Sequence, residues 1–188
     1  MGNADAWLLS GIETGDEGIP EERMRKMNAA RLWSLEQLSQ ADREFVESFQ
    51  PTITVDLQNG QRLLCFHGSP SSFDDALFPD SPDERFHELL PCDEAQFFTG
   101  GHTHVQFVRH IGQGFHFNPG SAGSAYRHDQ EEGGTKYDAF AEYAILEVVG
   151  DKLGLEFRRT PFDVEELISV YKYSGRPHSE VAIAGYGR

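Results

Sequence analysis

The sequence predicts an α/β protein in which helices pack on a mixed sheet, and three observations support this prediction. Apolar residues recur with helical spacing between residues 38 and 49. From residue 52 onward the apolar pattern changes to a period of two, which is typical of strands. Some of these strands form hairpins and others stand singly between helices, so a purely parallel sheet fits less well. The chain of 188 residues can bury one core, and we expect residues 1–188 to form a single domain.

Two helices are expected in the first third of the chain. Pro20 suits the first position of a helix, and the two glutamates that follow favour its positive end. We therefore predict a helix that runs to about Trp33. Ser34 with Gln37 matches a capping box, which predicts that a second helix begins there and ends before Pro51.

Glycine-containing turns divide the middle and end of the chain into strands. Asn59-Gly60, residues 112–114 and residues 150–151 each predict a hairpin turn. The predicted strands cover residues 52–57, 62–66, 95–99, 105–111, 115–118, 143–149 and 152–159.

The connections carry weaker signals. We expect a loop at residues 69–82, a short helix at 83–90 and an exposed, acidic, glycine-rich loop at 120–138. Asp163 is a good N-cap and predicts a last helix over 164–173, followed by a loose tail.

The charge of the chain excludes some partners. Its net charge is −15, which repels the backbone of duplex nucleic acid and anionic lipid surfaces, so neither is expected to bind. No apolar run is long enough to span a membrane, and the first residues lack a signal-peptide pattern, so we expect a cytoplasmic protein. An anionic substrate would need a local positive centre, and a metal ion is the simplest one.

Four short segments carry side chains suited to metal chemistry: Gly2-Asn3-Ala4-Asp5, Phe66-His67-Gly68-Ser69, Gly101-His102-Thr103-His104 and Asn118-Pro119-Gly120-Ser121. Loops at the carboxyl ends of strands converge in α/β sheets, so His67 and His102 could meet in space. In extended chain, His102 and His104 would present both rings on one face, where they could bind one metal or two adjacent ones.

Each segment also has a simpler interpretation. A single histidine after a strand is usually a hydrogen-bonded polar residue, and Gly-Asn or Asn-Pro-Gly-Ser is usually only a turn. The functional hypothesis depends on all four segments occurring in this order. We expect His110, His116 and His128 to be solvated surface residues, and residues 129–132 to be a solvated acidic loop.

The order GNAD, FHGSP, GHTHVQFVRH and FNPGSAG resembles the calcineurin-like metallophosphoesterases, in particular their compact bacterial and archaeal phosphodiesterase branch. The resemblance covers nearly the whole chain, including the segment EYAILEVVGDKLGLEFRRTPFDVEELI near its C-terminal end. It implies an αββα sandwich with mixed sheets. It also implies that a metal-bridging hydroxide hydrolyses a phosphodiester or a small phosphomonoester.

The resemblance implies a ligand set for two divalent metals, which would be Mn, Fe, Ni or Zn. Asn3, His67 and His102 look like ligands of the second metal, and His104 looks like a ligand of the first. Asp5 resembles the acidic residue that orients these ligands from behind. Asn118 and Ser121 resemble the loop that braces the site.

Two departures from the family pattern qualify this expectation. The family pattern opens with Asp-x-His and Gly-Asp segments before Gly-Asn, and neither precedes it here. We therefore expect the chain to be the C-terminal portion of the domain, with about half of the ligands and without two N-terminal βα units, roughly 60 residues in all. Ala4 also stands where many relatives have a histidine that acts as the general acid, which favours chemistry that depends on metals more than on protonation.

Two other functions remain open at this point. The chain could be a non-catalytic scaffold or binding protein on the same fold, as the retromer scaffold subunit is, or an inactive truncated fragment. The oligomeric state is also open.

Overall fold

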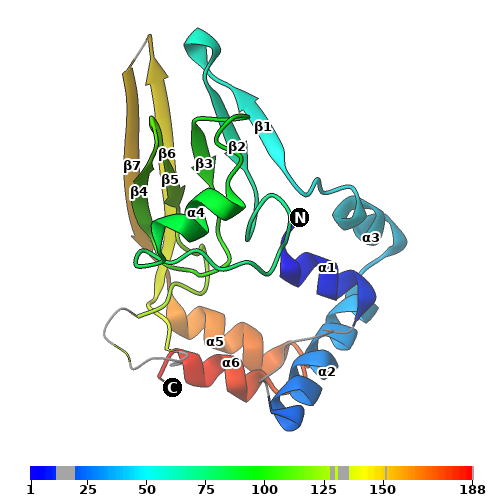
Figure 1. Cartoon of the computed structure of the whole chain (residues 1–188). Coiled ribbons are helices and arrows are strands. Elements are labelled where there is room, and N and C mark those ends of the chain that lie inside the picture. The colour runs from blue at the N-terminus through cyan, green and yellow to red at the C-terminus, as the bar shows by residue number, and fades with distance from the viewer. Residues whose placement is uncertain (12–19, 128–129, 131–135, 151, 188) are drawn as a thin grey trace.

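The computed structural model describes residues 1–11, 20–127, 130, 136–150 and 152–187. The predicted mixed α/β architecture is confirmed, with helices beside a five-stranded and a two-stranded sheet (Figure 1). The helices of the described chain are α1 Asn3–Ser10, α2 Glu21–Gln37, α3 Gln40–Glu47, α4 Asp83–Leu89, α5 Val164–Tyr173 and α6 Ser179–Gly185, with a short 3-10 turn at Gln58–Gly60. The strands are β1 Ile53–Asp56, β2 Arg62–Cys65, β3 Phe97–Thr99, β4 Phe107–Ile111, β5 Gly114–Asn118, β6 Phe140–Val149 and β7 Lys152–Pro161.

The boundary between α2 and α3 lies later than the sequence predicts. Ser34 is inside α2, where its hydroxyl donates to the Ala30 carbonyl at 2.9 Å. The capping box is instead formed by Ser39 and Asp42. The Ser39 backbone N–H donates to Asp42 Oδ2 at 2.9 Å, and the Asp42 N–H donates to Ser39 Oγ at 3.2 Å. The prediction at Ser34 was wrong because a serine can also bond back within a continuing helix.

The five-stranded sheet has the order β1-β2-β3-β5-β4. Strands β2, β3 and β5 run parallel, whereas β1 and β4 are antiparallel to their neighbours β2 and β5. The three predicted hairpins are confirmed: β1–β2, β4–β5 and β6–β7. Gly60 and Gly112 have φ angles of 72° and 56°, the left-handed conformation that such turns need. Because the parallel strands lie side by side, their carboxyl ends share one edge of the sheet.

Both faces of the parallel strands β2, β3 and β5 are covered. On one face, Leu64 and Phe98 form a core with Phe86 of α4. On the other face, Leu63, Phe97 and Phe117 are buried. The partners that pack on this second core include Ala144 and Leu146 of β6 and Leu153, Leu155 and Phe157 of β7. The two sheets therefore pack face to face, as in the predicted sandwich.

One expected surface residue is in the core. His116 is 1% exposed and its ring lies 5.4 to 6.0 Å from the rings of Phe66, Phe86 and Phe107. The surface prediction was wrong because β5 is covered on both faces, so its polar position also lies inside. His110 on β4 is exposed as predicted, and His128 lies outside the described residues.

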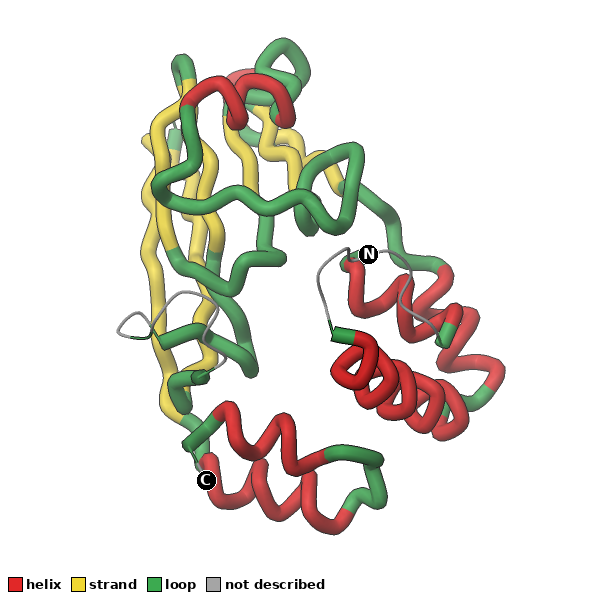
Figure 2. Tube along the Cα trace, turned by 60° about the horizontal axis from the view of Figure 1, so that its bottom comes forward, coloured by secondary structure: helices red, strands yellow, loops and turns green. Residues whose placement is uncertain are grey.

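The C-terminal part is more ordered than predicted. Asp163 caps α5 as expected, because its Oδ1 accepts from the Glu165 N–H at 2.9 Å. The tail forms α6 rather than a loose segment, and Tyr186 at its end lies 5.3 Å from Tyr137, ring to ring. Figure 2 shows α1–α3, near the N-terminus, and the pair α5–α6, near the C-terminus, as two groups of helices beside the strands.

The predicted loop at 120–138 is also only partly exposed. Ala125 is fully buried, and Tyr126 forms an antiparallel bridge with Tyr137. Residues 129, 131 and 132 of the acidic stretch lie outside the described residues. Among the helices that the structure describes, none is long and apolar enough to cross a membrane.

Candidate metal centre

The four sequence segments meet at the carboxyl edge of the parallel strands. His67 follows β2, His102 follows β3, and Asn118 ends β5. Backbone hydrogen bonds continue the pairing past the strand ends, since the Gly101 N–H donates to the His67 carbonyl at 2.8 Å. Asn3 is the first residue of α1. Loops at such an edge are where α/β proteins build their sites.

Asn3 and His67 form the closest contact in this group. His67 Nε2 lies 2.9 Å from Asn3 Oδ1, although 64 positions separate the two residues. Gly2 permits this approach, because a Cβ atom there would lie 3.0 Å from His67 Nδ1. Asp5 fixes the start of α1, since its Oδ2 accepts from the Gly2 N–H at 2.8 Å. Asp5 thus holds the end of the helix that carries Asn3.

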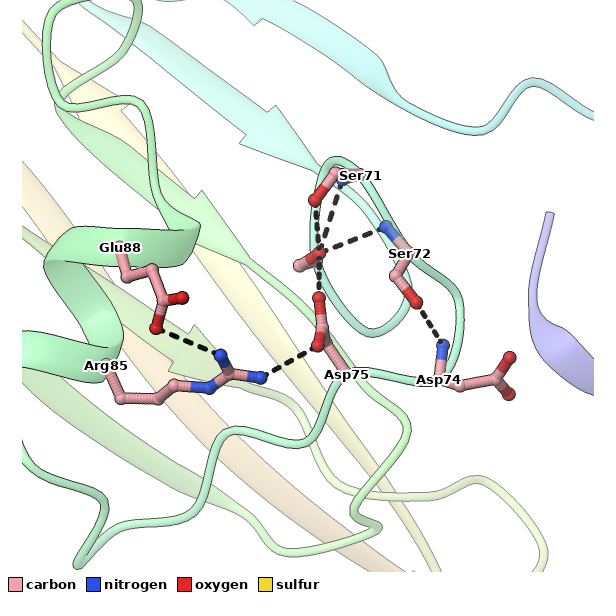
Figure 3. A network of polar contacts seen from close by, with 7 residues as sticks. Ser71, Ser72, Asp74, Asp75, Arg85 and Glu88 are labelled. Carbon is pink, nitrogen blue, oxygen red and sulfur yellow. Dashed lines mark hydrogen bonds and ion pairs between the residues drawn. The ribbon is translucent and has the colours of Figure 1, made fainter. Parts of the chain in front are cut away.

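The loop after His67 is held by a polar network (Figure 3). Ser69 donates from its hydroxyl to Asp75 Oδ2 at 2.6 Å, and Arg85 of α4 donates to Asp75 Oδ1 at 2.8 Å. The loop closes tightly over Gly68, where a Cβ atom would lie 2.6 Å from the Asp75 carbonyl oxygen. The network thus ties the backbone next to His67 to α4.

The two histidines of the His-x-His segment have different neighbours. The ring of His102 lies 5.3 Å from that of His67. His104 Nδ1 instead lies 2.8 Å from the Ser124 carbonyl oxygen, and its ring is 5.3 Å from Tyr126.

The predicted extended conformation of this segment was wrong. His102 and His104 have φ angles of 59° and 56°, both in the left-handed region. Residues other than glycine adopt this region at a cost, and such positions concentrate at functional sites.

Asn118 and Ser121 brace this strained turn from the loop after β5. Asn118 Nδ2 donates to the Gly101 carbonyl at 2.6 Å and to Thr103 Oγ1 at 3.0 Å. Ser121 Oγ accepts from the Ser124 N–H at 3.0 Å, next to the carbonyl that His104 contacts. Asn118 thus bonds directly to this turn, whereas Ser121 bonds to the loop beside His104.

Glu142 of β6 is a buried residue that the sequence analysis missed. It is 4% exposed, and its Oε1 forms an ion pair with Arg159 Nε at 2.9 Å. Its Oε2 accepts from the Ser121 N–H at 3.4 Å, and a Cβ atom at Gly120 would lie 2.1 Å from that oxygen. The period of two in β6 could have predicted its burial. Ala144 and Leu146 point inward, and Glu142 lies two positions before Ala144 on the same face.

Burial favours the neutral form of His67 and His104. It lowers the pKa of His67 to about 4, with a further contribution from the neighbouring His102. It also lowers the pKa of His104, although the hydrogen bond with the Ser124 carbonyl acts in the opposite direction. A neutral imidazole has a free lone pair, which is the form that binds a metal.

One donor set in this group fits a divalent metal. An amide oxygen from Asn3 and imidazole nitrogens from His67 and His102 suit a borderline ion such as Mn²⁺ or Zn²⁺. In the part of the chain that the structure describes, no three His, Cys, Asp or Glu side chains gather at one point. The neighbours of His104 are a carbonyl oxygen and an aromatic ring, so His104 alone does not form a second site.

Comparisons with known proteins identify the family of the chain and structures of similar fold. The family model of the calcineurin-like phosphoesterase superfamily domain matches residues 1–153. A hypothetical protein from Pyrococcus horikoshii has a similar structure, with a TM-score of 0.73 and 17% identity over 97% of this chain and 69% of that one. A metallophosphoesterase from Sphaerobacter thermophilus has a TM-score of 0.65 and 20% identity over 100% of this chain and 75% of that one. No curated protein sequence matches. The chain therefore belongs to the calcineurin-like phosphoesterase superfamily, whose members are hydrolases of ester bonds and usually bind divalent metals.

Proposed function

We propose that this protein is a metal-dependent phosphoesterase that hydrolyses a phosphodiester or a small phosphomonoester. The contact between Asn3 Oδ1 and His67 Nε2, at 2.9 Å and beside the His102 ring, is the observation that carries the proposal. Three donors from distant parts of the chain meet there at the edge of the parallel strands. A set of nitrogen and oxygen donors at one sheet edge is suited to a metal ion.

In this proposal Asn3, His67 and His102 hold one metal, and His104 contributes to a second. When bound, divalent metals neutralise the charge that develops on the phosphoryl oxygens and activate the attacking water. The protein keeps the His67 imidazole neutral by burial, and Asn118 and the network around Asp75 fix the backbone of the loops at this edge. These contacts hold the donors in place before the substrate binds.

The absence of a histidine at position 4 favours certain substrates. Ala4 is exposed beside Asn3, and its N–H donates to Asn3 Oδ1 at 2.9 Å. A general acid at this position would protonate a poor leaving group, a contribution of about 10²- to 10⁴-fold. We therefore expect ester substrates with good leaving groups to react best.

Hydrolysis of bis(4-nitrophenyl) phosphate tests the proposal. We expect turnover with added Mn²⁺, loss of turnover with a chelator, and a rate at least about 100-fold lower in His102→Ala, a larger loss than removal of a supporting partner. His110→Ala is the matched control, because His110 is exposed on β4 and should leave the rate unchanged. Hydrolysis that continues at the same rate with the chelator, or in His102→Ala, would contradict the proposal.

A non-catalytic binding protein is the second candidate, and the edge strand β1 favours it. Ile53 and Val55 point the same way from β1 and are 56% and 41% exposed. Exposed apolar residues on a free strand edge are suited to pairing with another chain. A folded protein that shows no hydrolysis with Mn²⁺, Fe²⁺, Ni²⁺ or Zn²⁺ would favour this alternative.

A further inference from the structure

A cavity of about 650 Å³ lies away from the candidate metal centre, between α2 and the C-terminal helices. Arg23, Lys26 and Met27 of α2 line one side. Arg176 lines the opposite side, in the connection between α5 and α6, and Tyr137 also borders the cavity. None of the four candidate metal ligands lines it. The volume is within the range of sites that hold small organic molecules.

The charge of the lining is opposite to that of the whole chain. The chain has 16 Lys and Arg residues against 31 Asp and Glu residues, yet among the cavity residues that the structure describes Glu22 is the one carboxylate. Glu22 forms an ion pair with Lys26 at 3.1 Å, so these two charges neutralise one another. The guanidinium groups of Arg23 and Arg176 are left as a net positive charge. A cleft lined by one sign of charge concentrates ligands of the opposite sign.

Apart from His178, the remaining lining residues are apolar or aromatic. Met27 of α2 faces Val181 and Ala182 of α6 across the cavity. Guanidinium groups match the oxygens of a phosphate, because each can donate two parallel N–H bonds to them. The apolar walls would contact the organic part of the same ligand.

We propose that this cavity binds a small organic phosphate, with Arg23 and Arg176 on the phosphate and Met27 and Val181 on the organic part. This site is separate from the proposed catalytic centre and does not require that the protein be an enzyme. A chain of aromatic contacts connects the cavity with the candidate metal centre. The Tyr137 ring is 5.5 Å from the Tyr126 ring, which is 5.3 Å from the His104 ring.

Isothermal titration of the full chain with phenyl phosphate, AMP and inorganic phosphate tests the proposal. The titrations contain a chelator, so that metal binding cannot contribute. We expect at least one organic phosphate to bind several-fold more tightly than inorganic phosphate. Arg23→Gln and Arg176→Gln should each weaken that binding about tenfold or more, as expected for lost charge-assisted hydrogen bonds.

Two variants separate this site from other effects. Arg25→Gln is the matched control, since Arg25 is exposed on α2, carries the same charge and does not line the cavity. His102→Ala should keep full binding, which distinguishes this site from the metal centre. The proposal is overturned if neither organic phosphate binds more tightly than inorganic phosphate, if Arg25→Gln weakens binding as much as Arg23→Gln, or if His102→Ala abolishes binding. Thermal melting of each variant checks that it is folded.

Discussion

His67 and His116 both have an imidazole pKa of about 4, but they lie in regions of opposite character. His67 stands among polar groups at the strand ends, with Asn3 at 2.9 Å and His102 as a ring neighbour. His116 lies among phenylalanine rings under α4, and neither of its ring nitrogens has a hydrogen-bond partner in the described part of the chain. Burial lowers both pKa values, so a lowered pKa by itself does not identify a ligand. The two histidines differ instead in their neighbours, which are polar at His67 and apolar at His116.

The largest expected difference between the two histidines is the effect of their substitution on metal affinity. We expect His67→Ala to reduce Mn²⁺ affinity by at least about 100-fold, because a direct ligand contributes more than a supporting partner. His116→Phe should leave the affinity unchanged, since its ring contacts are apolar and the replacement keeps them. Calorimetric titration with Mn²⁺ measures both. An equal loss in the two variants would mean that the contact between Asn3 and His67 is only structural.

Burial of His116 should also make the stability of the protein depend on pH. Its pKa is about 4 in the folded protein and about 6.5 in the unfolded chain. Between these values the unfolded chain binds the proton and the folded protein does not, so stability falls as the pH drops. Above pH 6.5 the histidine is neutral in both states and the effect vanishes.

We therefore expect the wild type to lose about 2 kcal/mol more stability than His116→Phe between pH 7 and pH 5. Urea unfolding at the two pH values measures the difference. His110→Phe is the control, because His110 is exposed and should not change the slope. Parallel curves for the wild type and His116→Phe would show that His116 is protonated without cost in the folded protein.

A smaller effect is expected at Glu142, which supports the polar region from behind. Glu142→Ala leaves Arg159 without its buried partner and removes the acceptor of the Ser121 N–H. Because Arg159 is 38% exposed, the loss should be about 1.5 kcal/mol, less than for a fully buried pair. Chemical unfolding measures it. Glu147→Ala, at an exposed position of the same strand, should change stability by less than about 0.5 kcal/mol, and an equal effect would contradict the supporting role.

The strands and the candidate ligands were predictable because their signals are local. Apolar alternation and glycine turns gave the three hairpins, and the side chains that follow β2 and β3 were expected to meet at one edge. The capping box at Ser39 was missed because Ser34 offers a similar pattern, and only the continuing hydrogen bonds of α2 distinguish them. The helix in the C-terminal tail was not predicted because its own sequence pattern is weak. Its packing on α5 and the contact between Tyr186 and the distant Tyr137 hold it in place.

The sequence by itself determined the α/β class, the hairpins and the four segments that carry Asn3, His67, His102, His104 and Asn118. These features depend on residue type and spacing, which any reader of the chain can see. Only the tertiary structure decided that His116 is buried, that Glu142 supports the loop of Ser121, and that His102 and His104 have left-handed backbones. It also decided that Arg23 and Arg176 line one cavity. Each of these depends on which distant surfaces pack together, and no local pattern specifies that.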